Sequence, residues 1–257
     1  MRNFIHSFQS EWLKKKRSLA SLLVFAGAFF IPLIILVAKL VRSGTLNAAS
    51  ISNRFWENLW NDALESMAIF LLPLGIALAT SLVTQIEFKN NTWKQLHTTP
   101  QTLTTIFFAK LSVILVMLLQ FFILFNIGVY LCGVIPTLLI TGVPYPSEPI
   151  PWLFFLKENI KYIIDCLPIL AIQYLISLQF KNFLVPVAGG IAIWILSITV
   201  LGWEYGHWIP YTYCGLNYLH GLGKYNRETP IHLLAIGYFI AFTVISYILY
   251  VNKKEKG

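Results

Sequence analysis

The chain has 257 residues, of which 57% are hydrophobic and only 12% are charged. A soluble core of this size cannot bury so much apolar surface, so the composition excludes a soluble globular domain and indicates an integral membrane protein. The formal net charge of +8 is interpreted as membrane topology and contact with anionic lipids, because the sequence shows no pattern typical of nucleic-acid binding.

Residues 1–18 are predicted to form an amphipathic helix along the inner membrane surface. Phe4, Phe8 and Trp12 recur every four residues and would form one apolar stripe, and a Lys and Arg cluster follows them. An ordinary basic anchor and an "elbow" helix that also contacts a cytoplasmic partner both fit this pattern. The next apolar run is too long for a signal peptide and lacks an A-x-A cleavage site, so we expect it to be retained.

Apolar runs of about 20 residues predict six transmembrane helices, because a helix satisfies its own backbone hydrogen bonds in the bilayer. The fold class is therefore all-α, with one transmembrane domain over 1–257. The predicted spans are 19–41, 66–86, 105–131, 162–180, 183–203 and 232–251. Lys and Arg concentrate on one side of this arrangement, which places both termini in the cytoplasm and the chain in the cell membrane.

The segment 87–101, "EFKNNTWKQLHTTPQ", is the most polar stretch in the middle of the chain. It is predicted to form a short cytoplasmic helix, in which Trp93 and Leu96 share a face and Pro100 ends the helix. An aromatic residue with a polar rim is typical of a peg that docks into a groove on another protein. The alternative is a solvated loop whose Trp93 anchors in the interfacial aromatic belt.

The predicted outer side is rich in aromatic residues. Residues 204–231 are interpreted as short re-entrant helices at the outer interface or as an extracellular loop with an aromatic belt. Four possible metal ligands occur there, but no HExxH-like spacing supports a metal site: His207, His220, Glu204 and Glu228. Cys132, Cys166 and Cys214 show no CxxC spacing, so we expect free thiols, with an outer disulfide as the alternative.

Charge inside the predicted spans is scarce. Lys39 and Asp165 are placed near outer ends, where their side chains are expected to reach the interface. Deeper polar residues are expected to join helices: Thr80, Ser81, Thr84, Gln120, Asn126, Gln173 and Gln179. The sequence indicates no buried carboxylate or His near the midplane, which argues against an ion-coupled transporter. It also indicates no paired Asp, Glu or His within the spans, which argues against a membrane enzyme, so no catalytic residue is predicted.

Several motifs together resemble the ABC type-2 permeases, with similarity to lantibiotic and bacitracin-type immunity or export permeases. Glu87, the "TWKQL" that starts at Thr92, Pro100 and the "FFAKL" that contains Lys110 resemble the first cytoplasmic loop of that family. The N-terminal "SEWLKKKRS", in which Glu11 and an apolar pair precede basic residues, is similar to the family's opening. Six spans and cytoplasmic termini agree, so the resemblance covers essentially the whole chain.

The resemblance implies the membrane-spanning subunit of an ATP-driven exporter, which pairs with a second copy or a sister permease and binds a separate ABC ATPase. ATP and Mg would bind the ATPase, since the only Gly-Lys pair here, at Gly223, does not belong to a P-loop. The implied coupling residues are Glu87, Lys89, Thr92, Trp93, Lys94, Leu96 and Thr99. The implied elbow residues are Phe4, Phe8, Glu11 and Trp12.

A lumen without charge favours an amphipathic or lipid-like cargo, such as an antimicrobial peptide. The alternative function is a non-transporting membrane scaffold or sensor partner, which would share the spans and the charge bias but need not stimulate an ATPase.

Overall fold

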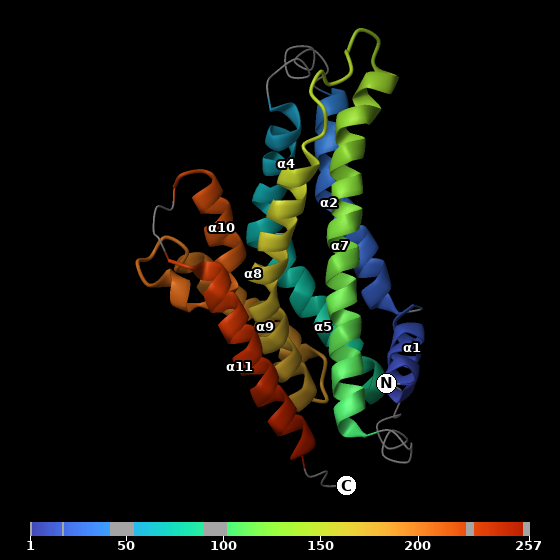
Figure 1. Ribbon diagram of the computed structural model, residues 1–257, viewed down its shortest axis with the longest axis vertical. Helices are drawn as coiled ribbons and strands as arrows, with labels where there is room; N and C mark the ends of the chain where they lie inside the picture. The colour runs from blue at the N-terminus through green and yellow to red at the C-terminus, as the bar shows by residue number, and fades with distance from the viewer. Residues whose placement is uncertain (1, 17, 42–53, 90–101, 225–228, 254–257) are drawn as a thin grey trace.

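The computed structural model describes residues 2–16, 18–41, 54–89, 102–224 and 229–253. In this part of the chain all regular structure is helical (Figure 1). The elements are α1 Arg2–Lys16, α2 Leu19–Val41, α4 Phe55–Ser66, the π-helix η2 Met67–Leu71, α5 Leu72–Lys89, α7 Leu103–Leu139, α8 Trp152–Gln179, α9 Leu184–Thr199, the 3-10 turns η3 Gly206–Trp208 and η4 Pro210–Thr212, α10 Tyr213–Gly221 and α11 Ile231–Val251.

Among the described residues, five helices are long and apolar enough to cross a membrane: Leu19–Val41, Phe55–Ile86, Leu103–Leu139, Trp152–Gln179 and Ile231–Val251. The fifth predicted span, 183–203, corresponds to α9, which has only 16 residues. A straight helix needs about 20 residues to cross the hydrocarbon core. The all-helical membrane fold is therefore confirmed, whereas the count of six full spans stays a prediction.

Three helices extend beyond the predicted spans. The second span was expected to begin at Ser66, but the helix begins at Phe55 and continues through η2 into α5. α7 continues to Leu139 and α8 begins at Trp152. The α4 and α8 extensions carry charged residues, which obscured them in a search for apolar runs, whereas the α7 extension contains Gly133 and Pro136, which usually end helices. In α4 the apolar residues still recur at helical spacing, and Trp56 and Trp60 are both 1% exposed.

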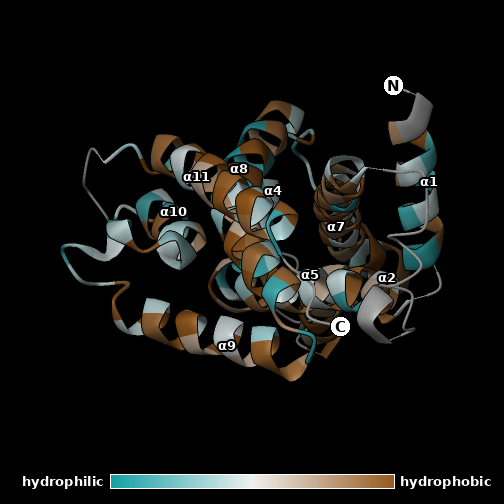
Figure 2. Ribbon diagram, turned by 90° about the horizontal axis from the view of Figure 1, so that it is seen from below, coloured by the Kyte–Doolittle hydropathy of each residue, from teal (hydrophilic) through white to brown (hydrophobic). Residues whose placement is uncertain are grey.

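The helices pack around α5 and α8. α8 packs against α5 and α11, α7 packs against α2, and α9 packs against α5. Figure 2 shows α5 and α8 near the middle, with α1, α2 and α7 on one side and α9, α10 and α11 on the other. α2 and α7 approach closely at Gly128, because a Cβ atom there would lie 2.9 Å from Pro32 Cγ.

The π-helix η2 connects α4 to α5 without breaking the helix. A π-helix inserts one residue into the helical ladder and disturbs the regular backbone hydrogen bonds. Trp194 of α9 donates its indole N–H to the Ile69 carbonyl oxygen at 2.9 Å. This hydrogen bond fixes the position of the short helix α9 against η2.

Hydrogen bonds define the two ends of the bundle. At one end the Lys253 ammonium donates to the Leu178 carbonyl oxygen at 2.7 Å, and the Thr104 and Tyr247 hydroxyls lie 2.8 Å apart. At the other end the Trp56 indole donates to the Glu148 carbonyl oxygen at 3.1 Å. The start of α7 and the ends of α8 and α11 therefore share one end of the molecule (Figure 1).

Candidate functional site

The predicted coupling segment is only partly within the described residues. Thr92, Trp93, Lys94, Leu96 and Thr99 lie outside them. Residues 87–89 belong to the last turn of α5, so Glu87 and Lys89 extend a long helix and do not begin a separate one.

The structure does describe the two helices that flank this segment. α5 ends at Lys89, and α7 begins at Leu103 after an N-cap at Thr102, whose hydroxyl accepts a hydrogen bond from the Thr105 backbone N–H at 3.3 Å. Both termini lie at the end of the bundle where α11 also ends (Figure 1). Two helices that together bound the cavity described below therefore lead directly from this segment into the bundle.

The predicted elbow helix is present as α1, which packs against α7 and α2. Phe8 and Trp12 stack with ring centroids 6.1 Å apart and pack against the core, but Phe4 is 38% exposed. Of the predicted apolar stripe, Phe8 and Trp12 therefore face the bundle, whereas Phe4 does not.

A polar stripe forms the buried face of α1. Ser7, Glu11 and Lys15, spaced four residues apart, are 2%, 5% and 2% exposed. The Lys15 ammonium donates to Gln120 Oε1 of α7 at 3.0 Å and lies 4.0 Å from the centre of the Trp12 ring. Burial lowers the pKa of Lys15. Because a buried cation is costly unless it is paired, these contacts fix both the position and the rotation of α1 on α7.

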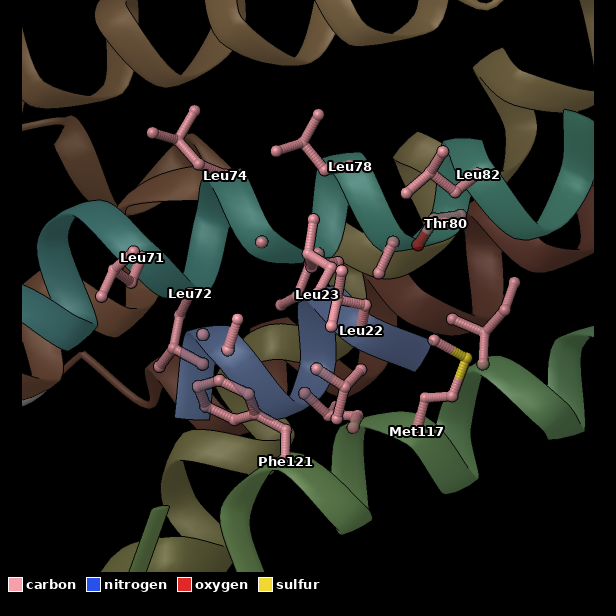
Figure 3. A pocket seen from close by; sticks show the side chains of 18 of the residues that line it. Leu22, Leu23, Leu71, Leu72, Leu74, Leu78, Thr80, Leu82, Met117 and Phe121 are labelled. Carbon is pink, nitrogen blue, oxygen red and sulfur yellow. The ribbon is translucent and has the colours of Figure 1, made fainter. Parts of the chain in front are cut away.

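An apolar cavity of about 600 Å³ lies between α2, α5 and α7 (Figure 3). None of the described residues that line it is charged, and Thr80 supplies a hydroxyl at one edge. Leucine side chains of α2 and α5 line it, with Met117 and Phe121 of α7 on the third side. Gly75 of α5 leaves space, because a Cβ atom there would have no other heavy atom within 4 Å.

Gln173 of α8 connects four elements. Its Nε2 donates to Ser81 Oγ of α5 at 3.0 Å and to the Pro186 carbonyl oxygen of α9 at 2.6 Å, and its Oε1 accepts from the Tyr211 hydroxyl of η4 at 3.1 Å. Gln173 is completely buried. The expectation that Gln173 and Ser81 join helices is met by these contacts, and Asn126 does the same with Asn159 of α8 at 3.0 Å.

Asp165 corrects one expectation of the sequence analysis. It was predicted to reach the outer interface, but it is completely buried in α8. Its carboxylate accepts from Asn217 Nδ2 of α10 at 2.8 Å and lies 2.8 Å from His232 Nδ1 of α11. Desolvation of a carboxylate is costly, and these two partners offset the cost.

The expectation that no acidic residue and histidine pair within the spans is therefore wrong. Both Asp165 and His232 were predicted near the outer ends of their spans. This shared depth was the feature of the sequence that could have predicted their contact. It was missed because the two residues are far apart in sequence.

The residues considered for a metal site do not form a three-ligand group in the described part of the chain. His207 Nδ1 lies 3.2 Å from the Glu204 carbonyl oxygen within its own turn, and Glu228 is outside the described residues. In the described ranges no three His, Cys, Asp or Glu side chains are arranged to hold a metal ion.

A family model described as "ABC-2 family transporter protein" matches residues 7–198. The match begins inside α1, includes the segment between α5 and α7, and ends inside α9. No curated protein matches the chain.

Proposed function

The chain belongs to the ABC-2 family of transporter proteins, and on this premise we propose that it moves an amphipathic cargo across or out of the membrane with energy from a separate ATPase. The resemblance noted in the sequence is confirmed by the family match. The chain is a multi-pass membrane component of an ABC transporter. The proposal also includes the direction of transport, which is export, and a cargo similar to lantibiotics or bacitracin. It further includes pairing with a second copy or a sister permease.

The observation that carries the proposal is the extent of the family match, because residues 7–198 include both predicted contact regions for an ATPase. In the proposal the coupling segment 87–101 and the elbow helix α1 contact the ATPase, on which ATP and Mg bind. ATP-driven closure of the ATPase would favour one arrangement of the helices through differential contacts at this end of the bundle.

The packing of the described helices supports a mechanical route. α5 and α7 leave the coupling segment and form two walls of the apolar cavity, and α1 is held on α7 by Lys15 and Gln120. A displacement of the ends of α5 and α7 would therefore change the width of the cavity. Packed helices transmit such a displacement as rigid bodies because protein interiors are close-packed.

The cavity supports the cargo class. Its volume of about 600 Å³ falls within the range of roughly 300–1,000 Å³ that is typical of small-molecule sites. Its apolar walls favour an alkyl chain or apolar side chains and offer no partner for a charged group. An amphipathic peptide or lipid could insert its apolar part there and keep its polar part at the membrane surface.

The proposal is tested by Trp93→Ala, with Trp152→Ala as the matched control. Trp152 is 72% exposed at the start of α8, on the predicted outer side. The chain is purified from its native membrane in mild detergent, and the eluate is examined for a co-purifying P-loop ATPase and for ATP hydrolysis. We expect Trp93→Ala to lower chain-dependent ATP hydrolysis about tenfold or more, the cost of losing a hot-spot aromatic, and Trp152→Ala to leave it unchanged.

Two results would contradict the proposal. One is a chain that purifies without any ATPase and does not stimulate candidate ATPases added to it. The other is an equal effect of the two tryptophan substitutions on hydrolysis, because the segment 87–101 would then have no specific part in coupling. A bound ATPase that never supports cargo movement in reconstituted vesicles would favour the scaffold function.

A further inference from the structure

Two cysteine thiols meet in the interior where α8 contacts α10. The Sγ atoms of Cys166 and Cys214 lie 3.5 Å apart, and both residues are completely buried. A disulfide has a sulfur–sulfur distance of about 2.0 Å, so closure requires the two sulfur atoms to move together by roughly 1.5 Å, a distance that side-chain rotation and small backbone shifts supply.

Cys132 has a different environment. It is buried in α7, and its thiol donates to the Pro32 carbonyl oxygen of α2 at 2.8 Å. This hydrogen bond joins α7 to α2 and gives the Cys132 thiol a structural role of its own. Of the three cysteines, only Cys166 and Cys214 are placed to react with each other.

The contact between the thiols belongs to a longer attachment. Asp165, the residue before Cys166, accepts a hydrogen bond from Asn217, which is one turn of α10 beyond Cys214. Farther along α8, Gln173 accepts from Tyr211. The segment from η4 through α10 is thus attached to α8 at three levels, and the thiol pair lies between the other two contacts.

We propose that Cys166 and Cys214 form a disulfide that fixes the segment 210–221 to α8. The two thiols lose two protons and two electrons and form one sulfur–sulfur bond. The electrons pass to the disulfide of a thiol oxidant in the outer compartment, which becomes a dithiol. The predicted topology places both cysteines toward the outer side, where disulfides form and persist.

The burial of both thiols indicates when the disulfide forms. The hydrogen bond with Cys166 and the loss of solvent raise the pKa of the Cys214 thiol well above its usual value. The thiolate is the form that attacks, so the folded chain resists both late oxidation and reduction. The bond therefore forms during assembly, before α10 packs on α8, and is retained afterwards.

The test counts free thiols in the full chain from its native membrane. Cells are quenched with acid, the protein is denatured without reductant, and free thiols are labelled with N-ethylmaleimide before intact-mass measurement. The chain has three cysteines, so the proposal expects most chains to carry one label before reduction and three after it. Three labels before reduction in most chains would overturn the proposal.

Single substitutions identify the pair. Cys132→Ser should carry no label before reduction and two after it, whereas Cys166→Ser and Cys214→Ser should each carry two labels without reduction. Two labels on unreduced Cys132→Ser would show that Cys132 takes part in the bond, and this result would also overturn the proposal. None of these counts depends on ATP hydrolysis or cargo, so failure here is distinct from failure of the proposed function.

Discussion

The Gln173 side chain makes hydrogen bonds to three other elements of the bundle. Its amide joins α8 to α5, α9 and η4, and it is completely buried. An amide in a membrane bundle is stabilised by such partners, and each hydrogen bond contributes on the order of 0.5–1 kcal/mol in measured membrane proteins. Besides the Trp194 hydrogen bond to η2, the position of α9 depends on Gln173 and on the small residue opposite it, Gly190.

Gly190 allows α9 to approach α5 and α8. A Cβ atom at this position would lie 2.8 Å from Gln173 Oε1 and 2.9 Å from Ala77 Cβ. Gly189, its neighbour in the same helix, has open space around the equivalent position. Replacement of either glycine by alanine improves helix propensity to a similar degree, so a comparison of the two variants isolates the steric cost.

We predict that Gly190→Ala destabilises the protein relative to Gly189→Ala by about 1–3 kcal/mol, the usual cost of overpacking. Thermal unfolding in detergent should show a lower melting temperature for Gly190→Ala, with Gly189→Ala at or slightly above the parent protein. Equal melting temperatures would mean that α9 does not rest against Gln173 as described.

At the scale of elements, the cavity is formed where three helices leave space between them. Gly75 lies in its wall on α5, and a larger side chain there would enter the cavity. Gly189 on α9 again provides the control, since it has space around it but does not line the cavity.

We predict that Gly75→Phe abolishes cargo movement and leaves ATPase binding intact, whereas Gly189→Phe changes neither. The bulky ring occupies volume that an apolar cargo group needs. The measurement is transport of a fluorescent amphipathic peptide in vesicles that contain the chain and its ATPase, with co-purification as the control for assembly. Full transport by Gly75→Phe would exclude this cavity from the cargo route.

The elements themselves were largely predictable, because apolar runs locate helices that face lipid. Leu19–Val41 and Ile231–Val251 have nearly the predicted bounds. The helical extension Phe55–Ser66 was not predicted, since Glu57 and Asp62 interrupt its apolar pattern. The Asp165 and His232 pair was missed for a related reason: its two residues are adjacent only after α8 and α11 pack together, and sequence spacing does not report that contact.

For the whole molecule, the distribution of Lys and Arg gives the predicted orientation. The start of α7 and the ends of α8 and α11 share one end of the bundle, and the Glu148 segment and the start of α4 share the other. These contacts agree with a topology in which successive connections between helices lie at opposite ends of the bundle. The excess of Lys and Arg at one end predicts that this end faces the cytoplasm.

We predict that a green fluorescent protein fused after Gly257 is fluorescent, and that alkaline phosphatase inserted after Tyr145 is active. The first reporter matures only in the cytoplasm, and the second is active only outside it. Tyr145 is exposed in the connection between α7 and α8, which favours insertion there. The reverse pattern of activities would invert the orientation and move the segment 87–101 away from any cytoplasmic ATPase.

The two partners of Asp165 are synthesised after Asp165 itself, and this order matters for membrane insertion. Asp165 lies in α8, but Asn217 and His232 are among the later residues to leave the ribosome. Until they arrive, the insertion machinery holds a helix with an uncompensated carboxylate, which is poorly suited to lipid. We therefore expect α8 to be stably inserted only after α10 and α11 have been made, and a chain truncated after residue 198, which lacks Asn217 and His232, to be degraded faster than the full chain.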